Sequence, residues 1–304
     1  MQPPYPSLTP TWHNDVYPAI EYTNPSLRHE GQTVVITGAV GRTLGLFSQC
    51  GLYWALASPK KRPRHGHRPA SGAWFSWAAM KTGCNRRRRP LSKRHPEVQV
   101  DVVVGDVTQE ASLEKLVGSL ESWDVLVQGA GYLNDPATAA GCDMDDYWKA
   151  FEINVKGFVV IVKALLPKAA PGASVVALVG GSIVFPTSML VGCSGYLVSK
   201  MALAKTVEFM SHENPDVAFY AVHPGMVDTD IFRRSGATPD MMAMDSRKLF
   251  AGFSLWVTLP EAKFLNGRFV WANWDIEELK QKKDEITSST NLTFNMAGFP
   301  FTSS

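Results

Sequence analysis

Short apolar runs that end in glycine or a polar residue recur along the chain, at 33–37, 98–107, 123–131, 173–180, 216–225 and 267–273. Most of them are rich in Val, Ile and aromatic residues, which is typical of buried parallel strands. Segments with helical periodicity alternate with these runs, at 112–122, 143–169 and 196–213. We therefore predict six strands connected by helices.

Strands that alternate with helices form right-handed crossover units in a parallel sheet. The pattern predicts an α/β fold: a Rossmann-like, doubly wound parallel sheet flanked by helices, with three layers in one domain. In such sheets the ligand lies beyond the carboxyl ends of the strands. We expect this domain to span 31–273, with 1–30 as an extended arm and 274–304 as a C-terminal helix and tail. Trp12 and Tyr17 are the expected anchors of the arm, with a packing role rather than a functional one.

Residues 48–94 interrupt the pattern where a helix, a strand and another helix are needed. About twelve Lys and Arg residues lie between Lys60 and Arg94, and no acid occurs between Glu30 and Glu97. A solvated basic loop, a nucleic-acid-binding or import segment, and a segment translated in the wrong frame or across a retained intron are the alternatives. We favour the loop or the misread segment, and we expect no nucleic-acid partner.

Composition indicates where the protein is located and whether it needs disulfides or metals. The longest apolar stretch, around 158–166, is interrupted by Lys163 and is far shorter than the roughly 20 residues needed to cross a bilayer. The N-terminus does not resemble a secretory signal, so we expect a cytoplasmic protein that does not bind membranes. The four cysteines lack the spacing of a zinc site and the density of a disulfide scaffold. We expect reduced thiols and no metal site.

Tyr196 and Lys200 are four residues apart at the start of a helical segment. Their side chains therefore share one helix face, about 5–6 Å apart at Cβ. A free tyrosine has a pKa of about 10 and is a poor base at neutral pH, but a neighbouring ammonium favours the phenolate and lowers that pKa. The spacing predicts a general acid/base pair, with a surface tyrosine beside a solvated lysine as the alternative.

Ser182 follows the strand at 173–180, at the same edge of the predicted sheet, and precedes Tyr196 by a short loop. Its hydroxyl is placed to hold a substrate oxygen. A serine that only caps a turn is the alternative, and Ser188 and Ser194 in the same loop are rival candidates.

Three further features indicate a dinucleotide site. Asn154 lies in an apolar helical segment, where its amide needs partners such as a backbone carbonyl, water or Lys200. Asp106 comes at the end of the strand at 98–107, where it can accept a hydrogen bond from an adenine amino group or cap the next helix. The turn after the first strand can bring backbone N–H groups to a pyrophosphate at a helix N-terminus, through Thr37, Gly38, Gly41 and Gly45.

Together these residues carry a family resemblance: a TG…G…G turn, Asp106-Val107, Ala130-Gly131, Asn154 in NVKG, Ser182, YLVSK and HPGMVDTD. The chain resembles the short-chain dehydrogenase/reductase family, of the classical type, over nearly everything except about 48–94. TWHNDVYPAI and GRFVWANWD resemble its filamentous-fungal members.

The resemblance implies an oxidoreductase that uses NAD(P). It implies a catalytic tetrad of Asn154, Ser182, Tyr196 and Lys200, with Lys200 also holding the nicotinamide ribose. Pro224-Gly225 and Thr229 would border the nicotinamide and its carboxamide. The full set of implied cofactor contacts is Thr37, Gly38, Gly41, Gly45, Asp106, Val107, Ala130, Gly131, Asn154, Tyr196, Lys200, Pro224, Gly225, Val227 and Thr229.

The sequence departs from the family pattern at defined positions. Arg42 and Leu44 occupy later glycine positions of the first turn, which predicts a shifted or lengthened loop. Where the family has N-N-A-G, this chain has Gln128-Gly129-Ala130-Gly131. The segment from Ser182 to Tyr196 is about one residue longer than usual in the family, so we expect it to bulge. The strand that reads the adenosine ribose falls within 48–94. We expect a slight preference for NADP, although no residue there can be assigned to it.

The leading hypothesis is reversible hydride transfer between NAD(P) and a carbonyl or secondary alcohol. The alternative is a catalytically inactive dinucleotide-fold protein whose cofactor half-site is defective because of 48–94. The segment 226–253 is expected to close over the substrate, and its apolar side chains predict an apolar small-molecule substrate: Phe232, Met241, Met242 and Met244. The resemblance also suggests a homodimer or homotetramer through the helices that flank Asn154 and Tyr196.

Overall fold

The computed structural model describes residues 3–27, 29, 31–38, 74–79 and 99–296. Within them, seven strands form one sheet in the order β3-β2-β1-β4-β5-β6-β7, and all neighbours are parallel. The chain proceeds outward from β1 to β3 and then returns to β4 beside β1, so the predicted doubly wound α/β fold is confirmed. The strands are β1 (Val34–Thr37), β2 (Trp74–Ala79), β3 (Gln99–Val104), β4 (Trp123–Gln128), β5 (Ala169–Leu178), β6 (Ala218–His223) and β7 (Phe269–Trp271).

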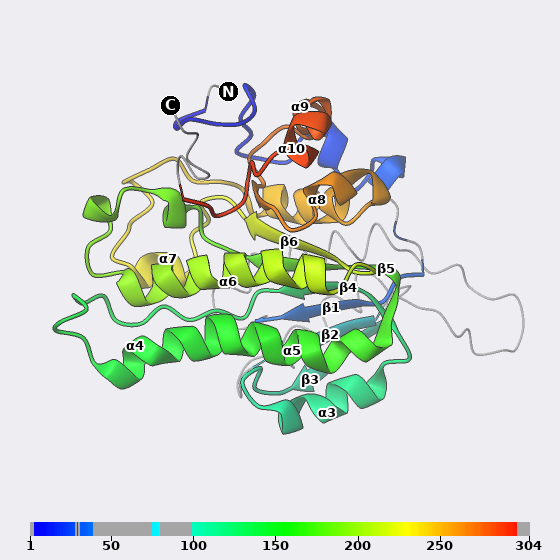
Figure 1. The fold of residues 1–304 in the computed structure, drawn as a ribbon, viewed down its shortest axis with the longest axis horizontal. Helices are drawn as coiled ribbons and strands as arrows, with labels where there is room; N and C mark the ends of the chain where they lie inside the picture. The colour runs from blue at the N-terminus through cyan, green and yellow to red at the C-terminus, as the bar shows by residue number, and fades with distance from the viewer. Residues whose placement is uncertain (1–2, 28, 30, 39–73, 80–98, 297–304) are drawn as a thin grey trace, which may run out of the picture.

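Helices cover the sheet. The α-helices are α3 (Glu110–Ser119), α4 (Met144–Phe151), α5 (Gly157–Leu165), α6 (Ser194–Glu213), α7 (Asp230–Arg234), α8 (Arg247–Val257), α9 (Ile276–Gln281) and α10 (Lys283–Thr287). Figure 1 shows α3, α5 and α6 across one face of the sheet, with α8, α9, α10 and the blue N-terminal segment grouped at the top. Among the described residues, no helix combines the length and the apolar composition of a membrane span.

Short 3-10 turns connect these elements, at Pro18–Ile20, Pro25–Leu27, Leu166–Lys168, Gly181–Val184, Thr187–Met189 and Pro260–Leu265. Two of them lie between Ser182 and Tyr196. The segment where we predict a bulge thus contains 3-10 turns before α6 begins at Ser194.

The strand β2 is not one of the six strands that the sequence predicts. The structure places Trp74–Ala79 between β1 and β3, with Val34 opposite Phe75. Trp74–Ala79 thus supply the second strand that the fold needs within 48–94, and the loop favoured from sequence is wrong for this part. The run WFSWAA has the aromatic residues that favour strands, but it is short and lies between basic stretches, which hide it in the hydropathy pattern. The rest of 48–94, and Gly41 and Gly45, lie outside the described residues.

The segment 143–169, predicted as one continuous helix, is divided into α4, a π-helical turn at Glu152–Lys156, and α5. The amide of Gly157 bonds to the carbonyl of Glu152, five residues earlier. A Cβ added at Gly157 would lie 2.8 Å from Val107 Cγ2, so α5 packs very closely against the loop after β3. Because π turns are frequent at functional sites, the position of Asn154 in the middle of this turn is relevant below.

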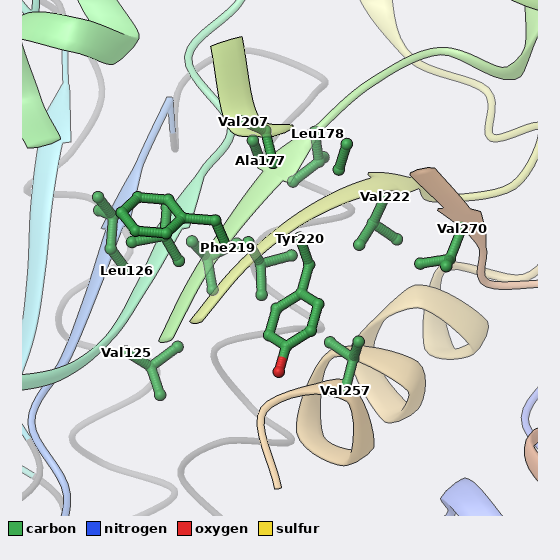
Figure 2. Packing of buried hydrophobic residues seen from close by; sticks show 14 of the residues in the cluster. Val125, Leu126, Ala177, Leu178, Val207, Phe219, Tyr220, Val222, Val257 and Val270 are labelled. Atoms are coloured by element: carbon green, nitrogen blue, oxygen red, sulfur yellow. The ribbon is translucent and has the colours of Figure 1, made fainter. Parts of the chain in front are cut away.

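The core lies on both faces of the sheet, because adjacent residues of a strand point to opposite faces. Phe219 and Tyr220, neighbours on β6, are both fully buried. Figure 2 shows Tyr220 extending toward Val257 of α8, whereas Val207 of α6 lies on the other side of the strands. Burial on both faces fixes the position of β6, whose carboxyl end carries site residues.

The N-terminal segment is held against the end of the chain. Trp12 forms an isolated antiparallel bridge with Trp274, and the amide of His13 donates to the carbonyl of Asn273 at 2.9 Å. The hydroxyl of Tyr17 accepts a hydrogen bond of 2.9 Å from the first amide of α9. These contacts anchor the arm beside β7.

Candidate active site

A cavity of about 340 Å³ lies beyond the carboxyl ends of β4, β5 and β6, where the fold predicts a ligand. Eight of the sequence-predicted residues line it: Gly131, Ser182, Tyr196, Lys200, Pro224, Gly225, Val227 and Thr229. Its other described walls are largely apolar and include Leu133, Phe185, Phe232 and Met242. Met241 and Met244 are not among the lining residues, so only part of the predicted apolar set faces this space.

Tyr196 and Lys200 share one face of α6, as their spacing predicts. The Lys200 ammonium lies 5.9 Å from the centre of the Tyr196 ring. Lys200 is 4% exposed and donates to the carbonyl oxygen of Leu178 at 2.9 Å. An ammonium has three N–H donors, so this bond leaves two for a ligand in the cavity.

Burial dominates the ionisation of this pair. It lowers the pKa of Lys200 to about 8, because a charged ammonium is disfavoured away from water. It also raises the pKa of Tyr196 to about 12, and a negative charge on Cys193 acts in the same direction. From the sequence we expect the lysine to lower the tyrosine pKa. In the protein alone the loss of hydration outweighs that effect.

Ser182 lies beside Tyr196 in the cavity wall. A Cβ added to Gly180 would be 3.4 Å from Ser182 Oγ and 3.7 Å from Tyr196 Oη, so the two hydroxyls flank one small space. The rivals Ser188 and Ser194 do not line the cavity; Ser188 lies in an exposed 3-10 turn, and Ser194 is the first residue of α6. The geometry therefore brings Ser182 to Tyr196.

Asn154 is fully buried, and its side-chain amide is hydrogen-bonded at both ends. Its Oδ1 accepts from the Tyr132 amide at 2.8 Å, and its Nδ2 donates to the Tyr132 carbonyl at 2.9 Å and to Ser199 Oγ at 2.8 Å. The Ser199 hydroxyl in turn donates to the carbonyl of Tyr196 at 2.7 Å. The backbone-carbonyl partner expected from sequence is present, whereas the bond to Lys200 is not. Asn154 connects the loop after β4 to the first turn of α6.

Thr37, the last residue of β1, and Gly38 after it are held tightly against the loop after β4. The buried Thr37 hydroxyl bonds to the Gln128 side chain and accepts from the amides of Gly129 and Ala130, both at 3.2 Å. Gly38 has a φ of +74°, and a Cβ there would lie 2.3 Å from the nitrogen of Ala130. Only glycine fits this conformation and this approach. Thr37, Gly38 and Ala130 therefore form the base of the expected dinucleotide site rather than the lining of the cavity.

Replacing Gly38 by alanine is expected to lower the free energy of unfolding by roughly 3 kcal/mol or more, because the left-handed backbone and the collision with the loop after β4 both add cost. Gly31→Ala is the matched control, since Gly31 has a φ of +78° and none of the described atoms lies within 4 Å of an added Cβ. Urea denaturation of both variants measures the difference. Equal losses of unfolding free energy in the two variants would show that the close approach of Gly38 to Ala130 does not affect stability.

Asp106 and Val107 lie after β3. The Asp106 Oδ1 accepts from the amide and the hydroxyl of Thr108, at 2.9 and 2.8 Å, so Asp106 holds a turn and is not the residue that caps α3, which is Gln109. This leaves its Oδ2 for another donor. Val107 is buried against Gly157, which makes it part of the packing beneath the site.

The loop after β6 forms the opposite wall. Gly225 has a φ of +91°, and a Cβ there would lie 2.8 Å from Asp245 Oδ2. The same carboxylate accepts from the Met226 amide at 2.5 Å, which fixes this turn. Thr229 caps α7, with its hydroxyl oxygen accepting from the Phe232 amide at 3.1 Å.

Sequence reasoning missed His223, the last residue of β6. It is buried, and burial lowers its pKa to about 3, so the ring is neutral. Its Nδ1 accepts a hydrogen bond of 2.9 Å from the amide of Gly181, next to Ser182. Its position could have indicated a site residue, because His223 lies at a strand end directly before Pro224-Gly225.

The arrangement is compatible with a bound dinucleotide. Gly131 keeps a gap open, since a Cβ there would lie 3.4 Å from both Asn154 Oδ1 and Lys200 Nζ. The ammonium of Lys200 beside that gap can hold ribose hydroxyls. The described residues contain no group of three or more His, Cys, Asp or Glu side chains that could hold a metal ion.

Comparison with known proteins assigns the family. The family model described as Enoyl-(Acyl carrier protein) reductase matches residues 73–254, which is more than half of the chain. The short chain dehydrogenase citE of Monascus ruber is 29% identical over 305 residues, covering 94% of this chain and 97% of that protein. The short chain dehydrogenase andI of Emericella variicolor is 26% identical over 299 residues, covering 93% and 94%.

Solved structures share the fold. A dehydrogenase/reductase from Sinorhizobium meliloti superimposes with a TM-score of 0.66 at 18% identity, covering 81% of this chain and 95% of that one. A short chain dehydrogenase from Burkholderia cenocepacia, in complex with NADP, gives a TM-score of 0.64 at 18% identity, covering 80% and 97%. With the family match and the resemblance in fold, the protein belongs to the short-chain dehydrogenase/reductase family of oxidoreductases.

Proposed function

We propose that the protein catalyses reversible hydride transfer between NAD(P) and a carbonyl or secondary alcohol. The observation that carries the proposal is the approach of the Ser182 and Tyr196 hydroxyls to one small space above Gly180. A carbonyl oxygen in that space can accept a hydrogen bond from each of them. Residues 31–273 would form the catalytic domain, with 1–30 and 274–304 as flanking segments.

Each side chain has a defined task in this proposal. Tyr196 Oη gives its proton to the substrate oxygen during reduction and takes it back during oxidation. Ser182 Oγ donates a hydrogen bond that stabilises the negative charge developing on that oxygen. Lys200 favours the phenolate as the proton leaves. Asn154 fixes the π turn and the start of α6 and supports a water relay to the tyrosine.

The bound nicotinamide would supply or accept the hydride. Its ring and carboxamide would lie against Pro224, Gly225, Val227 and Thr229, and its ribose against Lys200 and Tyr196. The adenosine half would lie along the turn at Thr37 and Gly38, beside Asp106, Val107, Ala130 and Gly131. The complex of the Burkholderia neighbour with NADP supports this use of the fold.

We propose a preference for NADP over NAD. A carboxylate after the second strand normally holds the ribose 2′-hydroxyl of NAD, whereas an arginine holds the 2′-phosphate of NADP. No acid occurs between Glu30 and Glu97, and the sequence after β2 is basic. Titration of the purified protein with NADH and with NADPH, followed by nicotinamide fluorescence, tests this. Tighter binding of NADH would refute the preference, and binding of neither would favour the inactive alternative.

The substrate oxygen site can be tested without touching a catalytic side chain. Gly180 has a φ of −74° and a ψ of 136°, which alanine adopts freely. Gly180→Ala would put a methyl group between the two hydroxyls, and we expect kcat/KM to fall by about 10²-fold, equivalent to about 3 kcal/mol. The melting temperature of Gly180→Ala should stay close to that of the wild type, because the atoms nearest to the added methyl belong to two side chains and lie 3.4 Å away or farther. Undiminished turnover in Gly180→Ala would place the substrate oxygen elsewhere.

A homodimer or homotetramer is proposed through α4 and α6. Trp148 on α4 and Phe209 on α6 are 55% and 59% exposed, and large apolar side chains at such exposure mark interaction surfaces when they are grouped. Light scattering after size exclusion tests the assembly, and a monomer at micromolar concentration would exclude it. The cytoplasmic location and the absence of a nucleic-acid partner stay predictions.

A further inference from the structure

A second cavity, of about 210 Å³, lies under the N-terminal arm. The two cavities adjoin at Ser182, whose hydroxyl forms one side of the proposed substrate oxygen site. They share Gly181, Ser182, Phe185, His223, Met226 and Met242. The residues proposed to hold the nicotinamide and its ribose, such as Thr229 and Lys200, line only the first cavity. The second cavity therefore extends away from the cofactor side.

Four aromatic rings line this second cavity. Tyr5 of the arm lies 5.2 Å from Phe185 and 6.0 Å from Trp12 between ring centres. Trp12 lies 5.7 Å from Trp271, the last residue of β7. These spacings are typical of interacting aromatic pairs, and the rings present both faces and edges.

The arm that contributes two of these rings is held in place. Asn14 Nδ2 donates to Asp245 Oδ1 at 2.5 Å, and the carbonyl of Asn14 accepts from the Ser246 amide at 2.7 Å. Asp245 also holds the Met226 amide of the turn after β6. The arm is thus connected through one carboxylate to the loop beside the proposed nicotinamide position, and the aromatic wall has a fixed position relative to Ser182.

We propose that the N-terminal arm completes the substrate site, and that the second cavity takes a planar aromatic ring system attached to the reacting carbonyl carbon. This inference rests on the proposed function. A flat ring fits because the walls are aromatic and apolar, and because stacking and edge contacts favour rigid π systems over flexible chains. Asp245 also lies in this wall, where its two oxygens already accept from Asn14 and from the Met226 amide and so hold the arm in place. The packing role expected of the arm from sequence is then only part of its task.

The test uses two methyl ketones that present the same reacting group, 2-acetylnaphthalene and butanone, with the full-length protein and NADPH or NADH. The measured quantity is the ratio of kcat/KM for the naphthyl ketone to that for butanone. Tyr5→Ala removes one wall, and we expect the ratio to fall about tenfold through a higher KM for the naphthyl ketone. Ala243→Phe, which fills the cavity from another side, should lower the ratio at least as far.

Two control variants distinguish the loss of the aromatic wall from a general loosening of the arm. Leu8→Ala shortens a side chain that packs against the core and does not line the second cavity; it should leave the ratio within twofold. Tyr5→Phe keeps the ring and should restore the wild-type ratio. If the wild type reduces both ketones and neither Tyr5→Ala nor Ala243→Phe changes the ratio, the inference is overturned while the proposed function stands.

If the wild type reduces no ketone, the proposed function fails and binding decides the inference. Saturation-transfer NMR of 2-acetylnaphthalene with the protein alone should show transfer to the naphthyl protons that is lost in Tyr5→Ala. Transfer that is absent, or equal in the two proteins, would refute the aromatic site.

Discussion

Tyr196→Phe is expected to lower kcat by about 10³-fold while leaving the fold and the affinity for the dinucleotide nearly unchanged. The substitution keeps the ring and removes only the hydroxyl that would transfer the proton, and a positioned acid/base group contributes about 10²- to 10⁴-fold. The loss should fall on kcat more than on KM, because the hydrogen bond to the substrate oxygen strengthens as charge develops there.

The measurement is single-turnover reduction of a responsive ketone, with NADPH or NADH binding and the melting temperature recorded on the same samples. Cys193→Ser is a useful companion, since it changes a cavity-lining side chain near Tyr196 without removing the proposed proton donor. It should leave the proton donor in place and retain most activity. A Tyr196→Phe protein with wild-type turnover would remove Tyr196 from the mechanism and leave Ser182 without its proposed partner.

The fold could be predicted from sequence wherever a strand was buried on both faces. The later part of β5, from Ala173, is buried and contains adjacent valines, and the sequence predicts its position. β2 was hidden because a strand of this length needs only a few apolar residues, and its neighbours in sequence are basic. The interruption of the long helix at Asn154 could not be foreseen, since a π turn changes the hydrogen-bond register without changing the apolar periodicity of the segment.

The candidate site was predictable where local spacing decides it, as for Tyr196 and Lys200 on one face of α6. It was not predictable where distant segments meet. The sequence gives no indication that Trp12 lies against Trp271, or that the amide beside Ser182 bonds to His223. The direction of the Tyr196 pKa shift was also missed, because it depends on how much water the fold excludes, which the spacing of Tyr196 and Lys200 does not record.

Lys200→Met is expected to lower activity strongly, whereas its effect on stability should depend on pH. Activity should fall on the order of 10³-fold, because the ammonium that favours the phenolate is lost. Stability should respond to pH. Burial lowers the pKa of Lys200 from 10.5 to about 8, so between these values the unfolded chain binds more protons than the folded protein, and wild-type stability gains with rising pH. Below pH 8 the full cost of burying the charge, about 3 kcal/mol, is present.

Methionine removes that cost at all pH values, but it also leaves the Leu178 carbonyl without its 2.9 Å hydrogen bond, a loss of about 1–3 kcal/mol. At pH 7 the two effects nearly offset each other. The free energy of unfolding of the wild type, minus that of Lys200→Met, should therefore increase by roughly 2–3 kcal/mol between pH 7.5 and 10 in urea titrations. Tyr196→Phe retains the lysine and should show the same increase against a Tyr196→Phe/Lys200→Met double variant. A difference that stays flat across this range would mean that Lys200 is not buried as a charge, and that its ammonium is hydrated from the cavity.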